Sequence, residues 1–332
     1  MQPGHLLTSG EIQKYFVNET ELWAGFNYVF SDACKKRSTY KFGLIKAILD
    51  NLFSVEESPR GMELSFTVLF GKFAENYWNI VTKYHLKQIR SDGKSDSTKL
   101  ENIFAAALEH SGIAGVVEFD SLAEQDRNHI IEEVAKQCRK NVVGALYNDF
   151  DGVLYGFDLK DTGIWINPVA YEFMLKFKIE IEQLNYYAWA KFMERINTDD
   201  AIRHVLSKLE LATPQRQDLS IYRKILQEEF ESNNCFYCGK KLGRSAHVDH
   251  VIPWTFMKSD HLWNFVLACP ACNTRKNDRL PNKANLSRVV TRNEDLLQSK
   301  SQIVREEFVG YNANLLWTIW DYAKLSGFRV SE

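Results

Sequence analysis

The sequence predicts a mostly α protein in which a small β-hairpin interrupts the helices and a compact cysteine-bracketed segment precedes a last helix. Three observations predict this fold. Apolar residues recur at helical spacing over most of residues 1–231, two short apolar runs between residues 150 and 167 have the length of strands, and two cysteine pairs bracket a basic segment. A chain of 332 residues, 45% of them hydrophobic, can bury one large core or two smaller ones.

Residues 1–231 form the predicted helical part, with Phe42, Ile45, Leu49 and Phe53 as one example of its period. The runs at 153–157 and 163–167 are separated by polar residues, which is typical of a β-hairpin. An Asn-Pro pair at 167 and 168 favours a helix start, and helical segments continue to about residue 230. We expect this domain to have a regulatory, partner-binding or target-selecting role.

Lysine and arginine are concentrated in one part of the chain. Residues 1–234 hold 27 Lys and Arg against 34 Asp and Glu, residues 235–292 hold 10 against 3, and residues 293–332 hold 4 against 6. The net charges of these segments are therefore −7, +7 and −2. Because a surface that binds nucleic-acid phosphates gathers Lys and Arg, the middle segment is the one suited to a polyanion.

The sequence predicts a cytoplasmic protein with no membrane contact. No stretch approaches the roughly 20 apolar residues that span a bilayer, and residues 1–16 lack the basic-then-apolar order of a signal peptide. Cytoplasmic thiols stay reduced, so we interpret the six cysteines as metal ligands or buried residues and not as disulfides.

Four of these cysteines have the spacing of a zinc site. Cys235 and Cys238 form one C-x-x-C turn, and Cys269 and Cys272 form another after a gap of 30 residues. Zinc prefers four ligands at tetrahedral corners, and each C-x-x-C turn presents two sulfurs at neighbouring corners. We expect these four cysteines to bind one structural Zn²⁺, and the long gap between the pairs to hold a folded element.

Three polar motifs accompany the cysteine pairs: Asp249-His250-Val-Ile-Pro253, Trp263-Asn264 and Asn273-Thr-Arg-Lys276. As a set, over residues 235–280, they resemble the HNH, or ββα-metal, endonuclease family. The nine-residue step from Asn264 to Asn273 is also similar to that in the HNH domain of RNA-guided CRISPR nucleases. The resemblance implies a ββα-metal nuclease domain at residues 232–292.

Three further pairs or triplets narrow the resemblance: Ile252-Pro-Trp254, Trp263-Asn264 and Leu280-Pro281. They are similar to those of bacterial HNH proteins that often sit in mobile or anti-phage loci. This resemblance implies a role in bacterial anti-phage defence.

Phosphodiester hydrolysis needs an activated water, a cation beside the phosphate and stabilisation of the leaving oxygen. We expect His250 to act as general base, because a neutral imidazole can take a proton from water near pH 7. Asp249 and Asn273 offer hard oxygens for one Mg²⁺ or Mn²⁺, which is the catalytic cofactor we expect. Asn264 is interpreted as a clip whose side chain ties the loop between the strands.

The basic residues that follow the second cysteine pair are candidates for phosphate contacts. Arg275, Lys276 and Arg279 are expected on a helix there, although such runs are also common on solvated faces. His247 shares a strand face with Asp249, and its interpretations are an extra metal ligand, a phosphate donor or a structural histidine.

The predicted partner is nucleic acid, and we expect double-stranded DNA. RNA is an open alternative, because the predicted nuclease domain would contact mainly the sugar-phosphate backbone. The alternative function is a zinc-ribbon module that binds nucleic acid without cleaving it.

The acidic helical domain could bind a protein partner or form a homodimer. Residues 293–332 are expected to form a C-terminal helical segment that packs back on the helical bundle.

Overall fold

The structure is a computed structural model that describes residues 4–91, 96–111, 115–212, 219–229, 233–243, 246–299 and 301–331. The chain divides into two compact units, Met1–Met174 with Lys178–Gln215, and Leu175–Phe177 with Arg216–Glu332. The sequence predicts three parts with boundaries at 231/232 and 292/293. The first boundary lies outside the described residues.

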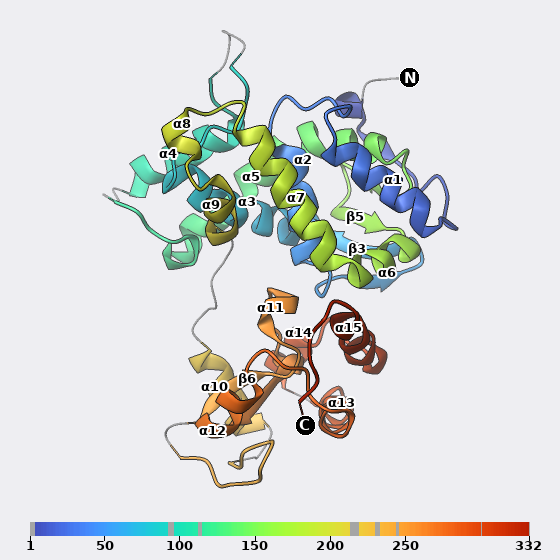
Figure 1. Ribbon diagram of the computed structural model, residues 1–332, viewed down its shortest axis with the longest axis vertical. Coiled ribbons are helices and arrows are strands. Elements are labelled where there is room, and N and C mark those ends of the chain that lie inside the picture. Colours follow the sequence, from blue (N-terminus) through green and yellow to red (C-terminus); the bar gives the residue numbers. More distant parts are fainter. Residues whose placement is uncertain are drawn as a thin grey trace. The chain divides into compact units, whose positions relative to one another are not determined.

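The first unit is mainly helical, as predicted (Figure 1). Its described α-helices are α1 (Glu19–Phe30), α2 (Tyr40–Asp50), α3 (Phe66–Thr82), α4 (Lys99–Ser111), α5 (Glu124–Asp149), α6 (Pro168–Lys176), α7 (Lys178–Met193), α8 (Asp199–Ile202) and α9 (Val205–Ala212). Two short 3-10 turns, η1 (Gly4–Leu6) and η2 (Phe119–Ser121), precede α1 and α5. No helix in the described part of the chain is long and apolar enough to cross a membrane.

The core of this unit lies where α2, α3 and α7 meet. Every residue of α2 except Lys41 is buried, so this helix is covered by neighbours on all sides. Trp189 of α7 stacks on Phe42 of α2 with ring centroids 6.3 Å apart and also contacts Tyr77 of α3. Large aromatic side chains therefore join the three central helices.

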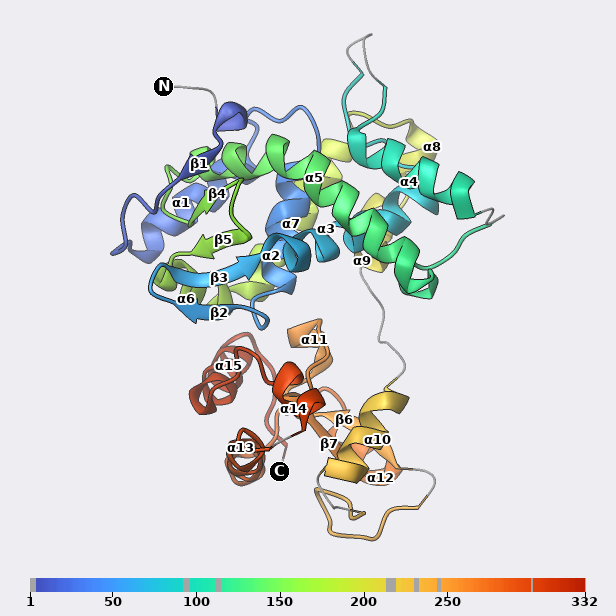
Figure 2. The ribbon, with the colours of Figure 1, turned by 180° about the vertical axis from the view of Figure 1, so that it is seen from behind.

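A five-stranded antiparallel sheet lies beside these helices, and Figure 2 shows its strands in order. The order is β1 (Ser9–Gly10), β4 (Tyr155–Asp158), β5 (Gly163–Ile166), β3 (Gly61–Ser65) and β2 (Glu56–Ser58). The predicted hairpin is confirmed as β4 and β5. This hairpin is part of a larger sheet than the sequence predicts, because β5 also pairs with β3 and β4 pairs with β1.

The second unit contains a two-stranded sheet surrounded by helices. Its described elements are α10 (Ser220–Glu229), β6 (His247–His250), α11 (Trp254–Met257), η3 (Leu262–Asn264), β7 (Phe265–Ala268), α12 (Pro270–Lys276), α13 (Lys283–Leu296), α14 (Gln302–Glu307) and α15 (Ala313–Leu325). Helix α10 packs on β7, where Tyr222 meets Phe265 with ring centroids 4.7 Å apart.

Helices α13 and α15 pack against the segment that the two cysteine pairs bracket and the residues just after it. Helix α13 runs through residues 292 and 293, and the predicted boundary there stays a prediction. Asn293 on this helix donates to the carbonyl of Trp263, and Trp320 of α15 donates to the carbonyl of Pro281. Residues 293–332 belong to the second unit, and their predicted packing on the helical bundle stays a prediction.

Candidate metal centre and active site

The predicted ββα order is present between residues 247 and 276. Strands β6 and β7 are antiparallel, with His247 opposite Ala268 and His250 opposite Phe265. Helix α12 follows directly, with Cys269 at its N-cap and Pro270 in its first turn, where the missing N–H is not needed. Strand β6 and helix α12 lie in contact, which brings their polar side chains together.

The four predicted cysteines form one cluster. Their Sγ atoms all lie within 4.8 Å of one another, and those of Cys238 and Cys269 are 3.9 Å apart. With Zn–S bonds of about 2.3 Å, tetrahedral ligands are roughly 3.8 Å apart, so the spacing and the sulfur chemistry fit zinc. The two cysteine pairs therefore make a possible zinc site, as the sequence predicts.

Backbone hydrogen bonds around Cys235 favour the thiolate form of its side chain, which is the form that binds a cation. Burial opposes ionisation, but hydrogen bonds from the backbone N–H groups of Cys269, Cys238 and Tyr237 outweigh it and lower the pKa of the Cys235 thiol to about 7. Burial and the neighbouring thiols raise the pKa of Cys272 to about 12. Several thiolates this close need a positive charge between them.

Asn264 is buried and ties two segments together. Its Oδ1 accepts from the backbone N–H of Ile252 at 2.8 Å, and its Nδ2 donates to the Ile252 carbonyl at 2.9 Å. The N–H of Val251 donates to the carbonyl of Asn264. These bonds link the turn after β6 to the start of β7, which is the arrangement that the clip interpretation requires.

His250 is buried at the end of β6, and two neighbours fix its ring. Its Nε2 lies 2.7 Å from Oδ1 of Asp260, and its ring meets Phe265 edge to face with centroids 4.7 Å apart. Asp260 belongs to none of the sequence motifs that predict the site. One signal was available, because Asp260 is one of only three acidic residues in the basic segment 235–292.

Asp249 is buried between a phenol and an ammonium group. The hydroxyl of Tyr237 donates to its Oδ2 at 2.5 Å, and Lys276 Nζ lies 3.4 Å from Oδ2. Burial and the adjacent carboxylate raise the pKa of Tyr237 well above its ordinary value, so the phenol stays a donor. Sequence reasoning missed Tyr237, whose place inside a C-x-x-C turn suggests only packing.

Lys276 requires a correction. The sequence predicts it on a phosphate-facing surface, but the residue is 4% exposed. Besides Asp249, its Nζ contacts the carbonyl of His250 at 2.5 Å. The spacing on α12 explains this, because residue 276 lies one turn beyond Asn273 and faces β6. Lys276 therefore binds the Asp249 carboxylate and the His250 carbonyl, whereas Arg275 and Arg279 are exposed.

Asn273 lies beside the exposed His247. Its Nδ2 is 3.1 Å from Nδ1 of His247, so the first turn of α12 meets the first residue of β6. His247, Asp249, Asn273 and Lys276 thus line the contact between strand and helix. Asn264 lies outside this row and contacts the turn after β6.

Residues 235–279 match the HNH endonuclease family. The match covers the cysteine cluster, both strands and α12, and it confirms the resemblance read from the motifs. Searches of curated proteins and of solved structures gave no match. The HNH domain supports a nuclease or nucleic-acid-binding role with a four-cysteine metal site.

Proposed function

We propose that the HNH domain is a metal-dependent endonuclease that hydrolyses phosphodiester bonds of nucleic acid by a one-metal mechanism. The observation that carries this proposal is the row of polar side chains between β6 and α12. There the Asp249 carboxylate lies with the His247 imidazole and the Asn273 amide, Tyr237 links Asp249 to the cysteine cluster, and His250 is the next residue of β6. A zinc ribbon that only binds nucleic acid has no need of this set.

His250 is the proposed general base. A carboxylate only accepts hydrogen bonds, so the contact with Asp260 places the ring proton on Nε2 and leaves the lone pair on Nδ1. Nδ1 is then the atom that takes a proton from the attacking water. Because Phe265 and Asp260 hold the ring, little reorientation is needed before the reaction.

Asp249 and Asn273 are the proposed ligands of the catalytic metal. Asn273 turns its Nδ2 towards His247, so its Oδ1 remains as an acceptor, and Asp249 contributes a carboxylate. Both are hard oxygen donors of the kind that Mg²⁺ and Mn²⁺ prefer. When bound, such an ion supplies positive charge beside the phosphate and an acidified water. The exposed His247 is a further donor at the same place.

The substrate is proposed to be nucleic acid, with double-stranded DNA carried over from the family resemblance. The exposed Arg275 and Arg279 on and after α12 suit contacts with phosphates, which carry no base sequence information. The anti-phage role and a protein partner or homodimer stay predictions from the sequence.

The test is cleavage by the purified full chain of supercoiled plasmid and of RNA, with Mg²⁺, with Mn²⁺ and without either. We expect plasmid cleavage only when one of the two ions is present. Equal cleavage after both ions are removed from a preparation that keeps its zinc would contradict the one-metal proposal.

A further prediction concerns the metal ligands. Asp249→Asn and Asn273→Ala should each raise the Mn²⁺ concentration needed for half-maximal cleavage by at least about tenfold, because each removes one oxygen donor. Part of the lost rate should return at high Mn²⁺. Asp278→Asn, an exposed acidic residue just after α12, is the control and should titrate like the wild type. An unchanged Mn²⁺ titration for Asp249→Asn would remove Asp249 from the ligand set.

The non-catalytic alternative has one observation in its favour. The ammonium group of Lys276 already lies beside the Asp249 carboxylate and can balance its charge without a metal. If this is its only role, the full chain should bind DNA with the same affinity whether Mn²⁺ is present or absent, and should not cleave it.

A further inference from the structure

The first unit contains a cavity that belongs to none of the chemistry above. It has a volume of about 630 Å³, within the range of roughly 300–1,000 Å³ that is typical of small-molecule sites. The loop between α1 and α2, the first turns of α2 and α4, and one face of α5 surround it.

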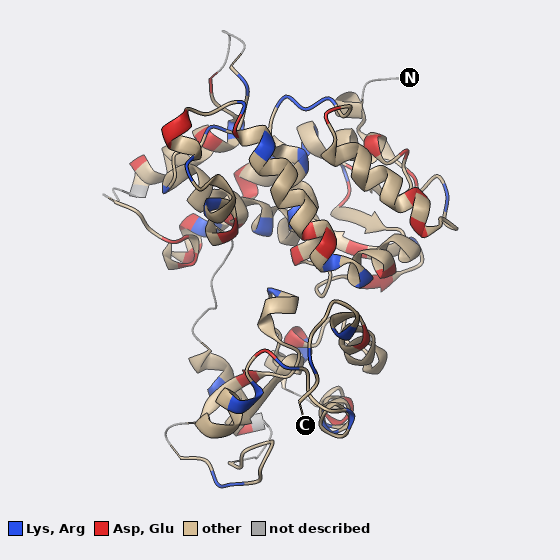
Figure 3. Ribbon diagram, in the orientation of Figure 1, with Lys and Arg blue, Asp and Glu red and all other residues tan. Residues whose placement is uncertain are grey.

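The lining of this cavity is basic, although residues 1–234 have a net charge of −7. Its basic residues are His5, Lys35, Lys36, Arg37, Lys41 and Lys99. None of the lining residues in the described part of the chain is Asp or Glu. Figure 3 shows the Lys and Arg run in the loop that leads into α2, within a unit whose helices carry many acidic side chains. This concentration of positive charge requires an explanation.

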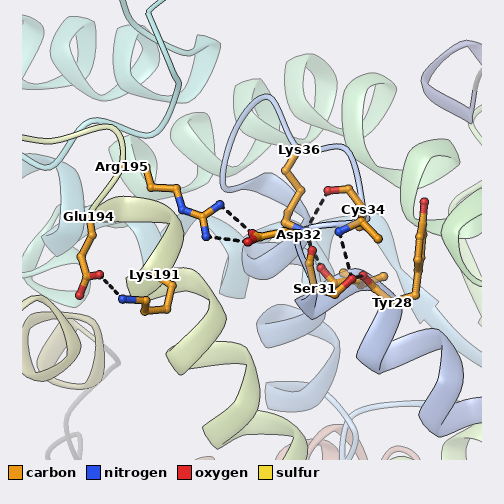
Figure 4. A network of polar contacts seen from close by, with 10 residues as sticks. Tyr28, Ser31, Asp32, Cys34, Lys36, Lys191, Glu194 and Arg195 are labelled. Atoms are coloured by element: carbon orange, nitrogen blue, oxygen red, sulfur yellow. Dashed lines mark hydrogen bonds and ion pairs between the residues drawn. The ribbon is translucent and has the colours of Figure 1, made fainter.

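The basic loop is held in place by a network of polar contacts (Figure 4). Arg195, in the turn after α7, binds Asp32 through two hydrogen bonds, of 2.7 and 2.9 Å. The Nζ of Lys36 donates to three backbone carbonyls, those of Val29, Ser31 and Cys34. The loop is thus ordered before any ligand arrives, which lowers the entropic cost of binding.

The walls of the cavity are joined through Tyr40. Its hydroxyl accepts a hydrogen bond from the backbone N–H of Leu100 in α4, and Cys138 of α5 contacts the same oxygen at 3.7 Å. Ser38, which directly follows the basic residues of the loop, forms a β-bridge with Ile89. Helices α2, α4 and α5 are therefore fixed relative to one another around the cavity.

Two of the lining cations, Lys35 and Lys99, have no ion-pair partner among the described residues. Lys41 forms an ion pair of 2.6 Å with Asp149, and Lys36 binds the carbonyls described above. Lys35 and Lys99 are exposed, and neither has an ion-pair partner among the residues that the structure describes. They come from different segments and line the same cavity, so a single anionic group can meet both.

We propose that this cavity binds a phosphorylated small molecule of nucleotide size. Lys35 and Lys99 would contact the phosphates, and the apolar wall of Ile89, Val142 and Ala145 would accept the base. A long polyanion fits less well, because the net charge of −7 over residues 1–234 repels an extended strand. This proposal does not depend on cleavage by the HNH domain.

The test is calorimetric titration of the full chain with ATP, AMP and GTP, and with adenosine, without added Mg²⁺ or Mn²⁺. At least one nucleotide should bind with one site per chain, and adenosine should bind at least about tenfold more weakly. The double variant Lys35→Ala/Lys99→Ala should weaken nucleotide binding by at least about tenfold, because each charged hydrogen bond contributes about that factor. Lys160→Ala, an exposed lysine in the β4–β5 turn, is the matched control and should bind like the wild type.

Three results would overturn the proposal: no binding by any of the three nucleotides, equal binding by the double variant, or equal binding of adenosine. A short DNA strand whose binding falls in the double variant, with no nucleotide binding, would instead assign this surface to nucleic acid. Zinc content and far-ultraviolet circular dichroism show whether the variants remain folded, so the outcome does not depend on nuclease activity.

Discussion

His250→Ala should reduce single-turnover cleavage by a factor of roughly 10²–10⁴, the usual contribution of a general base. The imidazole contributes the lone pair on Nδ1, and alanine offers no substitute. The backbone at residue 250 should keep its place, because Lys276 binds its carbonyl and β7 pairs with it. Zinc content and DNA affinity should therefore remain near the wild-type values, and added Mn²⁺ should restore nothing.

Two further variants separate the chemistry from the fold. His261→Ala removes another imidazole, one that stacks on Trp263 and contacts the hydroxyl of Ser259, and it should retain cleavage. Asp260→Asn keeps the shape of the side chain but can donate to Nε2, which favours the wrong tautomer, so cleavage should fall. Wild-type rates for His250→Ala, in protein free of contaminating nuclease, would end the proposed mechanism.

The fold could be predicted where apolar residues repeat at helical spacing over many residues. It could not be predicted where paired strands are distant in the sequence. Apolar residues repeat regularly in the helix that contains Phe42 and Leu49, whereas β3 offers only Leu64 as a buried apolar side chain. Its partner β5 lies about a hundred residues later, with Leu64 opposite Ile164. Local sequence cannot show such a contact, so the sequence predicts only one hairpin of the five-stranded sheet.

The residues of the candidate site were largely visible in the sequence because their motifs are local. Asp249 and His250 are adjacent, and Asn273 follows a cysteine pair directly. Lys276 was misplaced, since the same spacing that puts it on α12 does not say which face of the helix meets β6. Asp260 reaches His250 only through the path of the nine residues between them, which include α11, and no periodicity predicts that path.

The zinc site should matter for folding as much as His250 matters for cleavage. Cys235→Ser or Cys272→Ser should remove the bound zinc and disorder the cysteine turns together with α12. The buried cluster there consists of Cys235, Ala268 and Cys272, with partly buried Tyr237, Leu242 and Cys269 packed against it. So small an apolar cluster cannot hold its shape alone, whereas structural zinc contributes about 10–16 kcal/mol in comparable fingers.

The expected result is one zinc per chain in the wild type and far less than one in either variant, measured by elemental analysis. Cleavage should be lost as well, because Asn273 and Lys276 follow Cys272 on the same helix. The helical signal should fall only slightly, since most helices lie in the first unit. Cys138→Ser is the matched control, because this buried cysteine lies on α5, outside the cluster. The Cys138→Ser protein should keep one zinc per chain. Active, natively purified wild-type protein without zinc would contradict the assignment, and so would a Cys235→Ser variant that retains a full equivalent.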